Sequence, residues 1–439
     1  MSSEKMISSF RDPSGELYWE NGKLFRHIAP SYMDTYCMLM ESGLYDKLVT
    51  KNLLIPHTEL ENSGVIEPEI IPFISYPYEW CFSAYKDAAL ATLEIQELAL
   101  EHGMILKDAS SYNIQFNKGN PVLIDTLSFE EYKEGEPWGA YRQFCQHFLA
   151  PLALMSIVDL RLGRMMEMFI DGIPLDLASR MLPKMHLNIG VFLHLHGQAM
   201  AQKKIHKPSS KSMSKTALLG LMLNLKKTVN SLGLRRQDGW AEYTKTTSYN
   251  KCAADFKRDN VMDYVRKSRP ETVWDMGAND GSYSILAAEY ASTVVAFDRD
   301  LSCVELCYQN HRDKILPLVL DMTNPSPNIG WANRERMSLA DRSPADMIMA
   351  LALVHHLAIG NNTPLNMIAE WFHGLGKWLI IEFVPKEDPQ VKVMLTGRAD
   401  IFDKYTQAEF EREFGKYYEQ IDKKDIPQSC RSIYLFRAK

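Results

Sequence analysis

The spacing of apolar and polar residues divides the chain into two regions with different periods. From residue 271 onward, apolar runs of strand length alternate with segments of helical spacing, a pattern typical of α/β folds with parallel strands. The residues before 201 instead predict short strands followed by several helices, a separate α+β region. In the second region we predict strands at residues 271–276, 292–297, 315–320, 345–357 (including the functional tip) and 377–383, and a closing antiparallel hairpin of 417–421 with 432–436.

In the first region, two apolar runs around Asn21-Gly22 predict a β-hairpin over residues 15–28, because this dipeptide suits a tight turn between antiparallel strands. Residues 32–50 have helical spacing, residues 65–75 are β-branched and extended, and residues 87–101 form a strongly amphipathic helix. Further helices are predicted at residues 138–160, 163–168, 176–181 and 185–200.

A basic, Ser-rich stretch follows, and it predicts a connector between two domains. Residues 202–215 contain almost no large apolar side chains, which is typical of an exposed linker. Amphipathic helices are predicted at 217–232 and 253–267. We therefore expect a first domain at residues 1–201, a linker and helix at 202–239, and a second domain at 240–439.

Composition and charge narrow the classes of protein. A net charge of -6 argues against extensive binding to nucleic acid. Seven cysteines without a C-x-x-C pair predict reduced thiols rather than disulfides or zinc, and we expect no metal site. No apolar run reaches the length of a membrane span. We expect a cytoplasmic protein; the sequence does not indicate its oligomeric state.

The first chemical signal is the turn Gly277-Ala-Asn-Asp-Gly281, which directly follows the predicted strand 271–276. Glycine and asparagine tolerate the tight or left-handed backbone that such a turn requires. Asp298 ends the next predicted strand, about 20 residues further on, where nucleoside-binding folds hold ribose hydroxyls. The spacing therefore predicts a nucleoside site.

The residues within the turn indicate which kind of nucleoside. A dinucleotide fingerprint requires glycines at positions 279 and 282, where this chain has Asn279 and Ser282. Asp275 and Asp280 add negative charge that would repel a pyrophosphate. A ligand with a cationic end and no phosphate fits better.

The turn and Asp298 together resemble the cofactor motif of class I S-adenosylmethionine-dependent methyltransferases. The resemblance implies a Rossmann-like, seven-stranded methyltransferase sheet. By the same resemblance Asp321 would meet the adenine amino group, and Met322 would lie against the ring. The cofactor-binding residues it implies are Asp275, Gly277, Asn279, Gly281, Ser282, Asp298, Arg299, Asp321, Met322, Ala352 and Leu353.

Three further residues are candidates for catalysis, because ligands bind at the carboxyl ends of parallel strands. His355 and His356 follow the fourth strand, and Glu382 lies at the tip of the fifth. Methyl transfer relies mainly on orientation, so a base is needed only when the acceptor arrives protonated. A histidine is the first choice for that base and Glu382 the second; either histidine could instead shape the acceptor pocket.

In the first region, Asp108, Asn113 and Asp125 resemble the catalytic loop and the metal-binding aspartate of the protein-kinase-like fold. The resemblance implies that Asp108 would act on an acceptor hydroxyl while Asn113 and Asp125 hold magnesium for ATP. Leu106 stands where that family has a histidine, and no glycine-rich phosphate loop is visible. Three readings stay open: an ATP- and magnesium-dependent phosphotransferase, a reduced kinase-like domain used for binding, and ordinary turn residues.

The whole chain resembles a bacterial family of class I methyltransferases that includes nodulation proteins of the NoeA type. The shared segments are residues 106–113, 122–130, 141–155, 380–391 and 398–406. The resemblance implies O- or N-methylation of a small molecule or a saccharide, with the first domain positioning the acceptor. A non-catalytic partner subunit is the alternative from a different class.

Overall fold

The computed structural model describes residues 4–61, 63–183, 188–200, 212–234, 251–396 and 399–439. The chain forms two compact units, one of residues 1–235 with 328–336 and one of residues 236–327 with 337–439. Residues 202–211 and 235–239 of the predicted linker, and 240–250 of the predicted second domain, lie outside the described residues. Asn328–Arg336 belongs to the first unit while both of its flanks belong to the second, which differs from the predicted boundaries.

The first unit begins with a five-stranded antiparallel sheet in the order β1-β2-β3-β5-β4. The predicted hairpin is confirmed: β2 and β3 pair throughout, and Asn21 and Gly22 both have positive φ. The helical spacing over 32–50 corresponds to two short helices, α1 (Met33–Glu41) and α2 (Leu44–Thr50). The strands are β1 (Glu4–Lys5), β2 (Gly15–Glu20), β3 (Lys23–Ile28), β4 (His57–Leu60) and β5 (Val65–Pro68).

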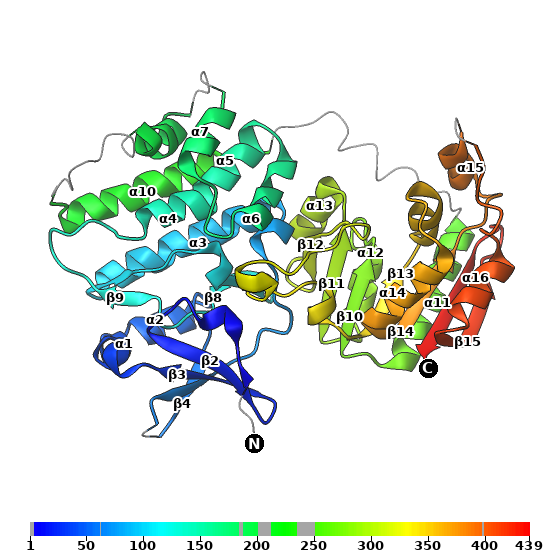
Figure 1. The fold of residues 1–439 in the computed structure, drawn as a ribbon, viewed down its shortest axis with the longest axis horizontal. Coiled ribbons are helices and arrows are strands. Elements are labelled where there is room, and N and C mark those ends of the chain that lie inside the picture. Colours follow the sequence, from blue (N-terminus) through cyan, green and yellow to red (C-terminus); the bar gives the residue numbers. More distant parts are fainter. Residues whose placement is uncertain (1–3, 62, 184–187, 201–211, 235–250, 397–398) are drawn as a thin grey trace. The chain divides into compact units, whose positions relative to one another are not determined.

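The rest of this unit is mainly helical and is built on α3 (Phe82–Glu101), whose side chains are mostly buried. Helix α10 (Lys215–Ser231) packs along α3 (Figure 1). The helix predicted over 138–160 is interrupted: a π-helical turn, Cys145–Leu149, separates α4 from α5. The other elements are α4 (Tyr141–Phe144), α5 (Ala150–Ile157), α6 (Met165–Met168), α7 (Leu175–Met181), α8 (Ile189–Val191), and the strand pairs β6 (Met104–Leu106) with β9 (Phe129–Glu131) and β7 (Ile114–Asn117) with β8 (Asn120–Leu123).

The second unit contains a seven-stranded sheet in the order β12-β11-β10-β13-β14-β16-β15. The first five strands in this order are parallel, and the last two are antiparallel to their neighbours. The predicted α/β sheet and its closing hairpin are therefore confirmed. The strands are β10 (Thr272–Met276), β11 (Thr293–Asp298), β12 (Leu316–Val319), β13 (Ala345–Ala350), β14 (Gly376–Phe383), β15 (Tyr418–Asp425) and β16 (Ser432–Ala438).

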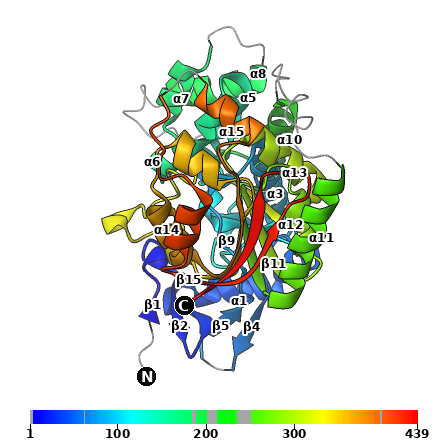
Figure 2. The same ribbon diagram turned by 90° about the vertical axis from the view of Figure 1, so that its right-hand side faces the viewer.

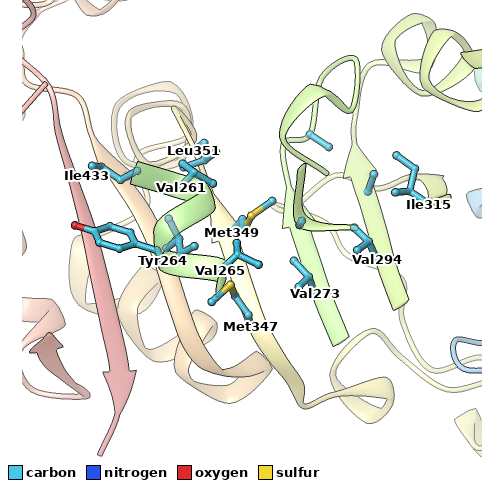
Figure 3. Close-up of a cluster of buried hydrophobic side chains, with 14 of the residues drawn as sticks. Val261, Tyr264, Val265, Val273, Val294, Ile315, Met347, Met349, Leu351 and Ile433 are labelled. Atoms are coloured by element: carbon cyan, nitrogen blue, oxygen red, sulfur yellow. The ribbon is translucent and has the colours of Figure 1, made fainter. Parts of the chain in front are cut away.

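Helix α11 (Lys251–Ser268) contributes side chains to the core of this sheet. Val261, Tyr264 and Val265 of α11 pack with Val273 of β10 and with Met347 and other residues of β13 (Figure 3). Helix α11 also lies beside α12 (Figure 2). The remaining helices are α12 (Ser282–Ala287), α13 (Leu301–His311), α14 (Leu365–Leu375), α15 (Pro389–Leu395) and α16 (Gln407–Phe414).

Over the part of the chain that the structure describes, no helix combines the length and the apolar character needed to cross a bilayer.

Candidate active site

The turn after β10 is held against the end of β11. The backbone N–H groups of Gly277 and Ala278 both donate to the carbonyl oxygen of Phe297, at 2.8 and 2.9 Å. Gly277, Asn279 and Gly281 all have positive φ, at 80°, 53° and 82°. Only glycine, and to a lesser degree asparagine, adopts this conformation readily, so the sequence of the turn suits its shape.

Asp298 closes the turn from the tip of β11. Its Oδ2 accepts a hydrogen bond from the backbone N–H of Asn279 and its Oδ1 one from the N–H of Asp300, both at 2.8 Å. Burial nevertheless raises the pKa of this carboxyl above its usual value. A carboxylate oxygen can accept more than one hydrogen bond, so Asp298 can still receive the hydroxyls of a ribose. The neighbouring Arg299 is exposed.

Asp275 is the second-last residue of β10 and is buried. It accepts a hydrogen bond from the hydroxyl of Ser284 at 2.7 Å, and burial raises its pKa to about 7. Asp280, the carboxylate within the glycine turn itself, accepts hydrogen bonds from the backbone N–H and the hydroxyl of Ser282 at 3.1 and 2.6 Å. A cationic ligand nearby would favour the charged form of Asp275.

Asp321 and Met322, the predicted adenine contacts, follow β12 and are half-buried. One oxygen of Asp321 accepts hydrogen bonds from the N–H and the hydroxyl of Thr323, at 2.9 and 2.7 Å. This side chain therefore shapes the loop after β12, while its second oxygen keeps its capacity to accept from an amino group.

The tip of β13 meets the glycine turn. A Cβ built on Gly277 would stand 3.3 Å from Cδ1 of Leu353, closer than most such contacts. Ala352, directly before Leu353, has a φ of 52°, a conformation that costs a non-glycine residue energy. The structure thus brings together two predicted cofactor segments that lie on different strands.

The two histidines after β13 differ in environment although their rings lie 4.2 Å apart. His355 is fully buried, and neither ring nitrogen has a hydrogen-bond partner among the described residues. Burial lowers its pKa to about 3, so His355 is neutral near pH 7. His356 is exposed, and desolvation together with the charges of Arg299 and Arg431 lowers its pKa as well.

Glu382 is fully buried and is held by two cations. Its carboxylate lies 2.7 Å from Nζ of Lys257 on α11 and 3.3 Å from the Arg431 guanidinium, which also binds Asp388 at 2.7 Å. Neither Lys257 nor Arg431 was predicted from the sequence as a site residue. A usable signal existed for Lys257, because it interrupts the buried stripe of α11 that includes Ala253 and Val261.

In the first unit, the structure brings Asp108, Asn113 and Asp125 into one half-buried cluster. Asn113 donates to Asp108 at 3.0 Å, and burial together with the charge of Asp125 raises the pKa of Asp108. Asp125 is paired with the Arg26 guanidinium of β3 at 2.5 Å, and Arg26 also binds Asp12 at 2.8 Å. Arg26 was not identified from the sequence. No group of three or more metal-binding side chains was found among the described residues.

The strand order, the glycine turn and Asp298 define a class of protein, the S-adenosylmethionine-dependent methyltransferases. No protein-family model matches the chain. The chain is 31% identical over 457 residues to the nodulation protein NoeA of Rhizobium meliloti (strain 1021), covering 98% of this chain and 96% of that protein. The chain therefore belongs to the NoeA family.

Several solved structures also match part of the chain. One is the N-methyltransferase NodS from Bradyrhizobium japonicum WM9, with a TM-score of 0.32 and 9% identity over 43% of this chain and 98% of that one. Another is the magnesium protoporphyrin IX methyltransferase of Synechocystis PCC 6803 with bound S-adenosylhomocysteine, with a TM-score of 0.30 and 14% identity over 43% and 84%. A third is the bifunctional kinase-methyltransferase WbdD, with a TM-score of 0.28 and 17% identity over 43% and 40%.

Proposed function

We propose that this protein methylates an oxygen or nitrogen atom of a small molecule or a saccharide, with S-adenosylmethionine as methyl donor. The observation that carries the proposal is the closure of the glycine turn by Asp298, through the hydrogen bond from Asn279. It leaves a carboxylate at the tip of β11 beside a turn whose acidic residues suit a cationic ligand and not a pyrophosphate.

The residues present fit the methyl donor. In the proposal Asp298 accepts from the ribose hydroxyls, and Asp275 with the turn of Gly277 and Asn279 lies toward the cationic amino-acid end. Asp321 and Met322 contact the adenine, and the backbone of Ala352 and Leu353 lines the same pocket. The remaining residues of the proposed cofactor site are Gly281, Ser282 and Arg299. The bound donor supplies a methyl group on a sulfonium, which is already a good leaving group.

The chain's own residues then orient the acceptor and receive its proton. We assign the proton-accepting role to His356, because it is exposed and its lowered pKa keeps it neutral near pH 7. His355 contributes unpaired ring nitrogens that can hydrogen-bond the acceptor. Two cations next to Glu382, Lys257 and Arg431, favour its charged form, so it is a poor proton acceptor. We therefore assign Glu382 a positioning role, in which its ion pairs fix the wall of the pocket.

For the first unit we propose a reduced kinase-like module that recognises the acceptor. The Arg26 guanidinium lies at Asp125, where the kinase resemblance would require magnesium. This contact favours a binding role over phosphoryl transfer from ATP.

Calorimetric titration with S-adenosylmethionine tests the cofactor assignment. We expect the wild-type protein to bind and Asp298→Ala to lose at least about tenfold in affinity. The matched control is Asp346→Ala, which removes a carboxylate at the opposite, amino-terminal end of β13, where it accepts from the backbone of Thr272. Absence of binding by the wild type, or equal binding by both variants, would overturn the assignment.

The acceptor can be sought with a methyl-labelled donor in an extract of bacterial metabolites. Transfer of label to a product by the wild type, and its loss in His356→Ala, is the expected result. A protein that binds the donor but labels no acceptor would instead support a non-catalytic partner subunit.

A further inference from the structure

The first unit contains a cavity of about 460 Å³. None of the candidate cofactor, catalytic or kinase-like residues lines it. Its lining comes from the start of the chain and from the Asn328–Arg336 segment, all within the first unit. The volume lies in the range of small-molecule sites, and the wall is mostly apolar. We call it the Trp331 cavity; its lining includes Lys5, Phe10, Glu16, Trp331, Ala332 and Arg334.

Two aromatic rings of the lining lie in solvent. Trp331 is 71% exposed and Phe10 is 53% exposed. Tryptophan is usually well buried because its ring is the largest apolar surface of any side chain. Single exposed apolar residues need no explanation, but two such rings at one cavity each offer a flat apolar face to a ligand.

The backbone is strained where it presents Trp331. Ala332 and Asn333 have φ angles of 54° and 55°, and two consecutive non-glycine residues in this region are uncommon. Strain of this kind persists where surrounding contacts enforce it, and it gathers at ligand sites. The strain here serves no core packing, because both residues are exposed.

Glu335 supplies the enforcing contacts. Its buried carboxylate accepts the backbone N–H of Trp331 at 3.0 Å and binds Arg11 through two nitrogens, at 2.6 and 3.0 Å. This two-point pair fixes the turn, so the backbone that carries Trp331 is held in place before any ligand arrives. A pre-organised group loses less entropy on binding.

The lining residues include both hydrogen-bond donors and a hydrogen-bond acceptor. The side chain of Arg334 is exposed and has no hydrogen-bond or ion-pair partner within the described ranges. Lys5 and Glu16 form an exposed pair at 2.6 Å, which offers donors beside an acceptor. A ligand that matches this lining has a flat apolar face and groups that both donate and accept hydrogen bonds.

We propose that the Trp331 cavity binds a saccharide. The face of a pyranose ring carries C–H groups that stack on an aromatic ring, while its hydroxyls both donate and accept. A lipid chain would offer no hydrogen-bonding partner to Arg334 or to the pair of Lys5 and Glu16. The inference rests on the proposed function, since this saccharide would be the acceptor or part of it.

The test is binding of defined oligosaccharides to the full-length protein, by calorimetry and ligand-observed NMR. The probes are tetramers of glucose in β-1,4 and α-1,4 linkage, of N-acetylglucosamine in β-1,4 linkage and of galacturonate in α-1,4 linkage. We expect at least one to bind, Trp331→Ala to weaken that binding at least about tenfold, and Phe10→Ala to weaken it less. Met168→Ala, which truncates a 79% exposed side chain outside the cavity, is the matched control and should leave it unchanged.

S-adenosylmethionine affinity of the same variants separates this inference from the proposed function. It should be equal in the wild type, Trp331→Ala and Phe10→Ala, because neither residue belongs to the proposed cofactor site. Unchanged thermal unfolding of the two variants shows separately that they are folded. Failure of every tetramer to bind, or binding that survives both aromatic substitutions, overturns the saccharide site. Saccharide binding without any affinity for S-adenosylmethionine would overturn the methyltransferase proposal and leave the saccharide site standing.

Discussion

Leu353, after β13, packs against the backbone of Gly277, after β10, so closely that a Cβ on Gly277 would stand 3.3 Å from its Cδ1. Gly277 also has a φ of 80°, which a side chain tolerates poorly. The glycine therefore satisfies two conditions at once, the shape of the turn and the approach of the neighbouring strand tip.

The first prediction concerns Gly277→Ala. We expect it to lower the free energy of unfolding by about 1–2 kcal/mol through the positive φ, and to weaken S-adenosylmethionine binding by about tenfold because Leu353 must move. Gly22→Ala is the control: its φ is 77°, but a Cβ there meets nothing within 4 Å. Denaturation and calorimetry should show a similar stability loss in both variants and lost affinity in Gly277→Ala alone. Equal affinity in the two variants would contradict the prediction.

The second prediction concerns the buried charge of Glu382. In Glu382→Gln, Lys257 and Arg431 lose a carboxylate partner inside the protein, and we expect a loss of about 3–5 kcal/mol in the free energy of unfolding. The exposed pair of Arg437 and Glu419 in the same unit provides the control, since Glu419→Gln should cost about 0–1 kcal/mol. Chemical denaturation distinguishes the two outcomes. A loss for Glu382→Gln no larger than that of the control would mean that the network is not a stabilising core of the unit.

Much of the second unit was predictable because its signals are local. Parallel strands such as β10 and β11 are short apolar runs that end in a glycine turn or an acid, as at Gly277 and Asp298. Such a run predicts a buried strand from its own residues alone, whatever it pairs with elsewhere in the chain. The predicted range 271–276 differs from β10 by a single residue. The helix over 138–160 was only partly right, because helical spacing does not distinguish an α-helix from one interrupted by a π-helical turn.

The charged partners of the site residues were not predictable in the same way. Arg26 and Asp125 lie on strands and loops far apart in the chain, as do Lys257 and Glu382, and no periodicity links them. Their pairing depends on the tertiary fold, where burial decides which charges must be neutralised. The Asn328–Arg336 segment was missed for the same reason, since its contacts with Arg11 are entirely long-range.

The third prediction concerns protons and Asp275. Burial raises the pKa of this carboxyl to about 7, so its contribution to stability is fully present below the ordinary value of an aspartate and is lost as the pH rises through 7. In the proposed site, S-adenosylmethionine favours the charged form. Binding near pH 6.5 should therefore release part of a proton, and the affinity should rise with pH through about 7.

Calorimetry in two buffers of different ionisation enthalpy measures this release. Asp275→Asn should abolish it and should make the protein relatively more stable above pH 7. Ser284→Ala is a useful companion, because it removes the hydroxyl that lowers this pKa and should move the release to higher pH. Proton release that persists in Asp275→Asn would assign the linkage to another group.

The fourth prediction concerns Arg26, whose buried guanidinium joins Asp125 to Asp12. Arg26→Met leaves both carboxylates without this cation, and we expect the free energy of unfolding to fall by about 3–5 kcal/mol. Arg161→Met, which breaks an exposed pair with Asp159, should leave the unfolding midpoint unchanged. Since Arg26 already balances Asp125, Mg²⁺ with ATP should not shift the thermal unfolding of the wild type. A magnesium-dependent shift that disappears in Asp125→Ala would show that this cluster binds ATP with magnesium and would contradict the proposed role of Arg26.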